Sequence, residues 1–245
     1  MGEAEMRKFS IAGAAVLGVL ASVAIGAIAQ DDVQTTFTID AAVLPNKAGT
    51  PKDPQGVKIK ASVRFFTPQG VDPPIVTHGY ALFPRNGDYN PHLYPRCDKR
   101  TLDRDGPSRC PKGSQIGAAR ASAYADTIIT RPRIEIFNGG PKVAFAYVTL
   151  YRPALVQTAV PARIREIPRG KWKYKVSVRV PEVLQVVAGI PIAARSFKGY
   201  VGKGNLIVTT SCPKSRRWPY EVKTYFTIGT PYKYRDSVPC RPAGR

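Results

Sequence analysis

The sequence predicts an all-β protein, with its strands arranged as an antiparallel β-sandwich that carries long, disulfide-stapled loops. Three observations lead to this fold class. Apolar and polar residues alternate with a period of two in many short segments, 23 prolines and 21 glycines interrupt the chain, and no helical period is sustained after the N-terminal apolar segment. Proline breaks helix interiors and glycine weakens them, so the composition also excludes a long-helix protein. A parallel sheet would need crossover helices between its strands.

The first expected element is a signal-peptide helix over residues 1–29. Arg7 and Lys8 precede an uncharged stretch over 10–28 that is rich in Ala, Val, Leu and Ile. The residues Ala27-Ile28-Ala29 have the small side chains of a signal-peptidase site, so we expect cleavage after Ala29. An N-terminal membrane anchor is the alternative, because the apolar run is about as long as the roughly 20 residues of a spanning helix. The mature chain is then an exported domain over residues 30–245.

Strand patterns follow one another along the mature chain. In the clearest one, residues 171–180, apolar side chains occupy the even positions and Lys, Ser or Arg the odd positions. This alternation is typical of a half-buried strand with a cationic outer face. A short helix is expected only within 181–189. The other segments predicted as strands are 33–39, 57–66, 75–83, 115–125, 133–137, 142–151, 205–211 and 221–228.

Residues 30–245 are predicted to form one β-sandwich domain, because neither a low-complexity linker nor an internal repeat divides them. Two packed sublobes, 30–140 and 141–245, are an alternative arrangement. The Asn138-Gly139-Gly140 segment between two strand patterns predicts a hairpin turn, since glycine adopts positive φ without steric cost.

All four cysteines lie in the exported part, where a thiol pair is usually oxidised to a disulfide. Four cysteines allow three pairings. We favour Cys97 with Cys110 and Cys212 with Cys240, because this pairing closes the shortest loops. The first pair would staple the irregular segment 84–112, which is otherwise long enough to suggest a functional loop. A metal site is not predicted, because no Cys-x-x-Cys or Cys/His cluster is present.

The chain is strongly basic, and its charge is uneven. It has 37 Lys and Arg against 17 Asp and Glu, a formal net charge of +20, and residues 141–245 contain 20 of the basic and four of the acidic residues. Such an excess attracts polyanions. Export makes anionic cell-wall polymers and phospholipid surfaces the expected partners, and no specific nucleic acid is expected. The alternative is that the cations only keep an exposed strand soluble and unaggregated. The candidate polyanion-binding residues are Arg163, Arg165, Arg169, Lys171, Lys173, Lys175 and Arg179.

One sequence motif resembles a known group of proteins. Cys110-Pro111-Lys112-Gly113-Ser114-Gln115-Ile116-Gly117 follows Cys97 and precedes Ser211-Cys212-Pro213 and Cys240. The pattern is similar to that of uncharacterised secreted β-rich proteins of actinobacteria, which carry a Cys-Pro-x-x-Ser-x-Ile/Val-Gly motif behind an earlier cysteine. The resemblance implies export, a β fold and disulfides. It implies no catalytic residue.

No catalytic residue or cofactor site is predicted. The two histidines, His78 and His92, stand outside any hydrolase motif, and Gly-x-Ser-x-Gly does not occur. We therefore expect a non-enzymatic, secreted protein associated with the cell envelope, whose basic C-terminal half binds anionic cell-wall polymer or a membrane surface. Two alternatives remain. One is a secreted glycan hydrolase that uses carboxylates such as Asp98 and Asp103 in the 84–112 loop, and the other is a β-sandwich that carries a lipid.

Overall fold

The computed structural model describes residues 35–68 and 74–243. The expected signal peptide, residues 1–29, lies outside the described residues. The all-β prediction is confirmed, because 57% of the structure is strand and 8% is helix. Across the two described ranges, no helix is long and apolar enough to cross a membrane.

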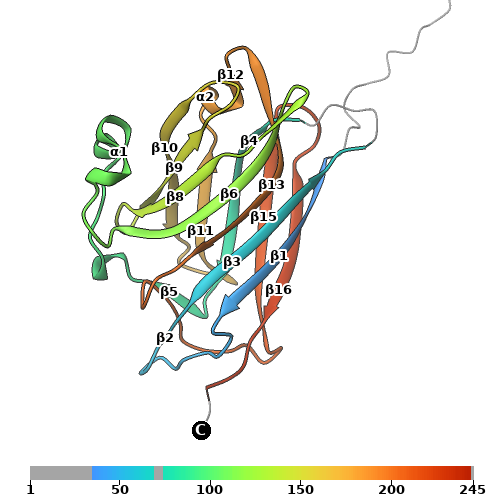
Figure 1. Cartoon of the computed structure of the whole chain (residues 1–245). Helices are drawn as coiled ribbons and strands as arrows, with labels where there is room; N and C mark the ends of the chain where they lie inside the picture. The colour runs from blue at the N-terminus through green and yellow to red at the C-terminus, as the bar shows by residue number, and fades with distance from the viewer. Residues whose placement is uncertain (1–34, 69–73, 244–245) are drawn as a thin grey trace, which may run out of the picture.

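One antiparallel sheet of 13 strands makes up most of the molecule (Figure 1). Its strands, in spatial order, are β1 (Thr36–Leu44), β3 (Lys58–Phe66), β13 (Ile190–Val201), β6 (Gln115–Ala125), β8 (Arg133–Asn138), β9 (Val143–Leu150), β10 (Val156–Glu166), β11 (Trp172–Arg179), β4 (Val76–Pro84), β15 (Arg217–Phe226) and β16 (Tyr232–Pro239). Two short strands extend it: β7 (Ile128–Thr130) pairs with β6, and β12 (Val186–Val187) pairs with β13. Since β13 lies between β3 and β6, strands from both sides of residue 140 share the sheet.

The remaining elements are short. A second sheet consists of three strands, β2 (Gln55–Gly56), β14 (Ile207–Thr209) and β5 (Gly87–Tyr89). The helices are η2 (Pro91–Leu93), α1 (Lys99–Asp105), η3 (Pro107–Arg109) and α2 (Glu182–Gln185). Helix α2 lies within 181–189, the segment for which a short helix is predicted.

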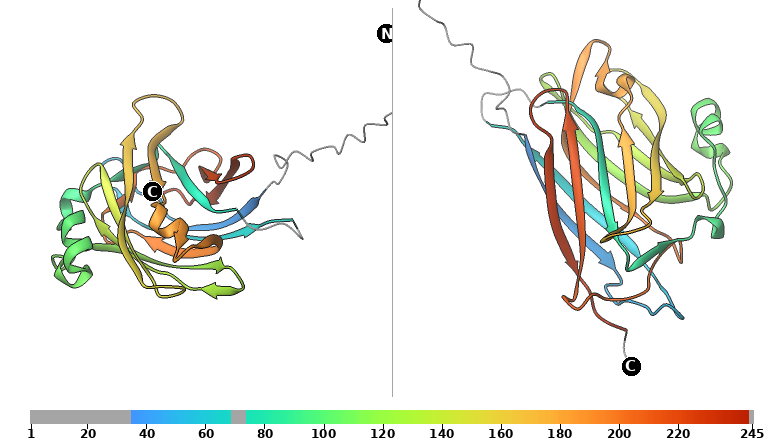
Figure 2. Two further views of the ribbon diagram at one scale, coloured as in Figure 1. Left: turned by 90° about the horizontal axis from the view of Figure 1, so that it is seen from above. Right: turned by 180° about the vertical axis from the view of Figure 1, so that it is seen from behind.

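The large sheet curls into a nearly closed, barrel-like form, so the predicted sandwich of two separate layers is corrected (Figure 2). Its first and last strands, β1 and β16, meet through side chains. The Phe37 ring packs 5.0 Å from the Tyr232 ring, centroid to centroid, and the Tyr234 hydroxyl donates to the Ile39 carbonyl at 3.3 Å. Period-two alternation determines which face of each strand is apolar. It contains no information on whether the twisted sheet splits into layers or closes on itself.

The apolar side chains fill the interior and also an outer layer beneath α1. Inside, Phe37 of β1 is 1% exposed and Leu206 is fully buried. Outside, the fully buried Leu102 of α1 packs with Tyr147 and Ala159 of β9 and β10. The helix therefore covers the outer surface of these two strands.

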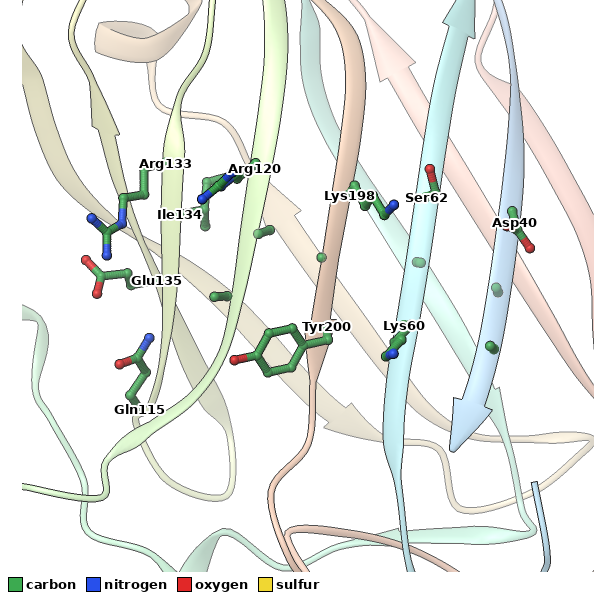
Figure 3. A pocket seen from close by; sticks show the side chains of 16 residues that line it. Asp40, Lys60, Ser62, Gln115, Arg120, Arg133, Ile134, Glu135, Lys198 and Tyr200 are labelled. Atoms are coloured by element: carbon green, nitrogen blue, oxygen red, sulfur yellow. The ribbon is translucent and has the colours of Figure 1, made fainter. Parts of the chain in front are cut away.

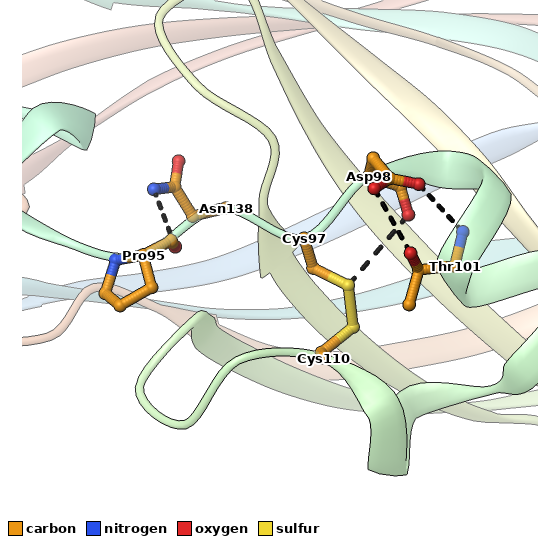
Figure 4. Close-up of a disulfide and its surroundings, with 6 residues drawn as sticks. All are labelled: Pro95, Cys97, Asp98, Thr101, Cys110 and Asn138. Carbon is orange, nitrogen blue, oxygen red and sulfur yellow. Dashed lines mark hydrogen bonds between the residues drawn. A yellow bond between two sulfur atoms is a disulfide. The ribbon is translucent and has the colours of Figure 1, made fainter.

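Both favoured cysteine pairings are confirmed, since disulfides join Cys97 to Cys110 and Cys212 to Cys240. The first disulfide staples the segment that contains α1 (Figure 4). Asp98 caps this helix by accepting a hydrogen bond from the Thr101 amide at 2.8 Å. Sequence reasoning missed α1, because a seven-residue helix with one buried anchor, Leu102, shows no helical period.

Each predicted strand segment overlaps a strand of the structure, but three long strands, β10, β13 and β16, were not predicted. Pro161 lies within β10 and cannot donate a ladder hydrogen bond, yet it stands opposite Phe145 of β9. Pro191 and Gly199 similarly obscure β13. In β16, Arg235 and Asp236 interrupt the apolar alternation.

Candidate functional site

The candidate polyanion-binding residues lie on the hairpin of β10 and β11. In this antiparallel pair, Arg163 stands opposite Ser177, and Arg165 stands opposite Lys175. Directly opposite residues project to the same side of a sheet, and every second residue of a strand does the same. The side chains of Arg163, Arg165, Lys175 and Arg179 therefore share one face. That face is the outer one, because Val178 packs with the interior side chains of β9 and β10.

The other three predicted residues are placed differently. Arg169 and Lys171 are exposed in the turn between the strands, and the Lys171 ammonium nitrogen lies 4.9 Å from the centroid of the Trp172 ring. A register irregularity between Trp172 and Tyr174 interrupts the alternation expected for 171–180. The structure therefore brings Lys175 and Arg179 together but does not place Lys171 beside them.

Lys173 is engaged in an ion pair with Asp88 of β5, and its side chain is only 19% exposed. Burial alone would lower the pKa of its ammonium group. The hydrogen bond to the Asp88 carboxylate and the charge interactions with Tyr174, Asp88 and Glu166 together outweigh that effect, and the pKa of Lys173 is raised. Lys173 thus remains charged, but its charge is already compensated within the protein.

The cationic surface continues from β11 onto β4 and β15, which lie beside it in Figure 2. Ser177 of β11 stands opposite Tyr80 of β4, and Tyr80 stands opposite Lys223 of β15. One row farther along the strands, Arg179 faces His78, and His78 faces Tyr225. We call the following residues the basic–aromatic face: Arg163, Arg165, Lys175, Arg179, His78, Tyr80, Lys223 and Tyr225.

Cations and rings are in contact across this face. The Lys175 ammonium nitrogen lies 4.1 Å from the centroid of the Tyr80 ring, and that of Lys223 lies 4.8 Å from the centroid of the Tyr225 ring. His78 stacks on Tyr225 with a centroid distance of 4.0 Å. Cation–π contacts of this kind hold long side chains in place without neutralising them.

Most of the cations keep their charge uncompensated. Within the described residues, no carboxylate oxygen lies within 4.0 Å of the charged groups of Arg163, Arg165, Lys175, Arg179 or Lys223. The buried carboxylate of Glu221 pairs instead with Arg235 at 2.5 Å. Burial and the nearby Arg179 guanidinium lower the pKa of His78, so this imidazole is neutral at pH 7. The positive potential of the face therefore comes from lysine and arginine.

The carboxylates of the 84–112 loop have structural contacts rather than a common site. Asp98 caps α1, and Asp105 accepts from Arg104 at 2.8 Å. Asp103 pairs with Lys99 and accepts a hydrogen bond from the Ala159 amide at 2.8 Å, so it ties α1 to β10. Among the side chains that the structure describes, no three His, Cys, Asp or Glu residues lie together as metal ligands would.

Sequence reasoning missed the contributions of His78, Tyr80, Lys223 and Tyr225. Each of them lies within a segment predicted as a strand, 75–83 or 221–228. The neighbour relations between β11, β4 and β15 join distant parts of the chain, and no local pattern in the sequence indicates them.

Comparisons with known proteins identify no relative. No protein-family model and no curated protein matches the chain. One solved structure, described as "AvmM Catalyzes Macrocyclization in Alchivemycin A Biosynthesis", is 9% identical, with 87% of this chain and 92% of that chain covered and a TM-score of 0.32. At that TM-score the similarity supports no argument about fold or function.

Proposed function

We propose that this protein is a non-enzymatic, exported component of the cell envelope, and that its basic–aromatic face binds an anionic cell-wall polymer. The observation that supports this proposal is the arrangement of uncompensated cations and aromatic rings over the adjacent strands β10, β11, β4 and β15. The two disulfides are compatible with an oxidising, extracytoplasmic environment.

The proposed binding is electrostatic and does not depend on the order of the units in the polymer. A polymer with repeated phosphate or carboxylate groups carries condensed counterions. Lysine and arginine side chains that pair with these groups release the counterions, which favours binding. Neighbouring strands are about 4.8 Å apart. Cations stand on the adjacent strands β10 and β11 and again on β15, beyond the rings of β4, and an extended polymer can cross these strands. The rings of Tyr80 and Tyr225 add apolar surface against which sugar rings can pack.

A polymer fits this face better than a phospholipid surface. Proteins that bind membranes at the interface usually bury apolar side chains beside their cations. Of the large apolar side chains that the structure describes as exposed, none belongs to the basic–aromatic face. The cations therefore lie on a polar surface without an apolar anchor for the bilayer.

The test compares three surfaces: purified polyglycerol phosphate polymer, vesicles that contain anionic phospholipid, and vesicles of zwitterionic lipid. We expect the purified protein to bind the polymer most tightly, with affinity falling steeply from about 50 to about 300 mM salt. Binding that is insensitive to salt, or absent at low salt, would overturn the proposal. Binding to anionic vesicles without binding to the polymer would assign the face to membranes instead.

A triple variant, Lys175→Gln, Arg179→Gln and Lys223→Gln, tests whether the basic–aromatic face is the surface responsible. The matched control removes three exposed cations elsewhere: Lys52→Gln, Lys112→Gln and Lys214→Gln. Both variants have the same net charge. If the face binds the polymer, the first variant has a lower affinity for it, and that affinity depends less steeply on salt. The affinity of the control variant should change little. An equal loss in both variants would mean that only the net charge matters.

A further inference from the structure

A second cationic surface lies on the opposite side of the barrel. There the outward side chains of β1, β3, β13, β6 and β8 line an open hollow of about 770 Å³ (Figure 3). Figure 1 shows these strands in front, whereas Figure 2 shows β11, β4 and β15 from behind. The hollow and the basic–aromatic face therefore point away from each other.

The strand register arranges the lining of the hollow in two rows. In one row, Lys198 of β13 stands opposite Arg120 of β6, and Arg120 stands opposite Arg133 of β8. In the next row, Tyr200 of β13 stands between Lys60 of β3 and Ala118 of β6. Small outward residues, Ala42, Ser62 and Ala118, stand beside the long ones in these two rows and leave the space of the hollow.

Tyr200 also lines a second hollow of about 420 Å³, together with Lys58 and Lys203. The Lys58 ammonium nitrogen lies 4.9 Å from the centroid of the Tyr200 ring, and the Tyr200 side chain is 41% exposed. The two hollows thus meet at an accessible aromatic ring that has cations on both sides. We call them together the Tyr200 groove.

The charges of the Tyr200 groove are available to a ligand. Over the described ranges, no carboxylate oxygen lies within 4.0 Å of the charged groups of Lys58, Lys60, Lys198, Lys203, Arg120 or Arg133. The groove also contains polar groups that accept hydrogen bonds from hydroxyls: Asp40, Glu135 and Gln115. A volume of this size is typical of small-ligand sites.

We propose that the Tyr200 groove is a binding site for a short acidic saccharide. A sugar ring packs against the Tyr200 ring, and its carboxylate groups pair with Lys60, Lys198, Arg120 and Arg133. The side chains of Asp40, Glu135 and Gln115 accept hydrogen bonds from the sugar hydroxyls. This site is distinct from the basic–aromatic face, and it requires both a ring and acidic groups in the same ligand.

The experiment is calorimetric titration of the triple variant Lys175→Gln, Arg179→Gln and Lys223→Gln, so that the basic–aromatic face contributes less to binding. The probes are a hexamer of galacturonic acid, a neutral glucose hexamer and a short polyphosphate of similar charge. We expect the acidic hexamer to bind and the neutral hexamer not to bind. Tyr200→Ala should weaken binding of the acidic hexamer about fivefold, since a stacked ring contributes about 1 kcal/mol. Tyr200→Phe, which keeps the ring, should retain most of the affinity.

A charge reversal at two exposed lysines, Lys60→Glu with Lys198→Glu, provides an independent test that leaves Tyr200 in place. It should abolish binding of the acidic hexamer. Equal binding of the neutral hexamer would overturn the proposal, as would an unchanged affinity in both Tyr200→Ala and the charge-reversal variant. The proposal would also be overturned if polyphosphate bound tightly and neither Tyr200→Ala nor Tyr200→Phe changed the affinity for polyphosphate or for the acidic hexamer. Failure here leaves the polymer test of the basic–aromatic face unaffected, because that test measures the other side of the barrel.

Discussion

The ammonium nitrogen of Lys175 lies 4.1 Å from the centroid of the Tyr80 ring on the neighbouring strand β4. The contact holds a lysine that has no carboxylate partner within the described residues. It therefore positions a positive charge at the surface and leaves that charge available to an anionic partner.

Replacing Tyr80 tests this relationship. Tyr80→Leu removes the ring but keeps an apolar side chain, so Lys175 loses its support and Tyr80 no longer offers a packing surface. A cation–π contact at an exposed site contributes about 0.5–1 kcal/mol, so polymer affinity should fall about two- to fivefold. Tyr80→Phe is the control and should bind like the parent protein. Equal affinities of the leucine and phenylalanine variants would show that the ring has no role.

Asn138 should be a major contributor to stability. Its side chain is fully buried, its amide nitrogen lies 2.9–3.1 Å from the carbonyl oxygens of Pro91, Tyr94 and Pro95, and its oxygen accepts from the Gly140 amide at 3.0 Å. Asn138→Ala leaves these buried groups without their partner, which should lower the free energy of unfolding by about 2–4 kcal/mol. Denaturant titration measures the loss. A change below about 0.5 kcal/mol would contradict this role.

The two disulfides should contribute unequally. Paired Cys→Ser variants open loops with sequence separations of 13 for Cys97–Cys110 and 28 for Cys212–Cys240. The loop-entropy model gives about 3 kcal/mol for the shorter loop and about 3.5 kcal/mol for the longer one. Chemical denaturation of both double-serine variants tests the order. A larger loss for the shorter loop would mean that packing around Cys97, which is 1% exposed, outweighs chain entropy.

Acid should weaken the α1 region through Asp98. The hydrogen bond from the Thr101 amide lowers the pKa of this carboxyl below its ordinary value of 3.8. A carboxyl whose folded-state pKa is depressed stabilises the fold above its ordinary pKa, and the contribution is lost as pH falls through the folded value. Hydrogen exchange of α1 amides should therefore show weaker protection below about pH 4. Asp98→Asn retains a capping oxygen but does not titrate, so its protection should depend less on pH in this range. The same pH dependence in both proteins would exclude Asp98 as the cause.

Local patterns predicted the parts of this structure that depend on neighbouring residues in the chain. Alternation within 171–180 identified β11 and its outward Lys175 and Arg179, and loop length identified the disulfide pairing. The irregularity at Trp172 was not predictable, because it depends on how β11 pairs with Pro84 of β4.

The parts that depend on distant residues could not be predicted. The position of Tyr80 beside Lys175, the Tyr200 groove and the closure of the sheet all follow from which strands become neighbours. Strand β10 illustrates a second limit. Pro161 reads locally as a break, yet the surrounding sheet accommodates it opposite Phe145.

The junction of β1 and β16 gives the barrel a preferred line of opening. These strands form the two ends of the hydrogen-bonded order, and aromatic side chains such as Phe37 and Tyr232 hold them together. Separating them breaks side-chain contacts and, just beyond the strand ends, two backbone hydrogen bonds between Arg241 and residues 46–48. Separating any other neighbouring pair in the order breaks a whole ladder of backbone hydrogen bonds. The barrel should therefore open locally between β1 and β16 before it opens elsewhere. Access to its interior should depend on the contacts at this junction, the ring packing among them.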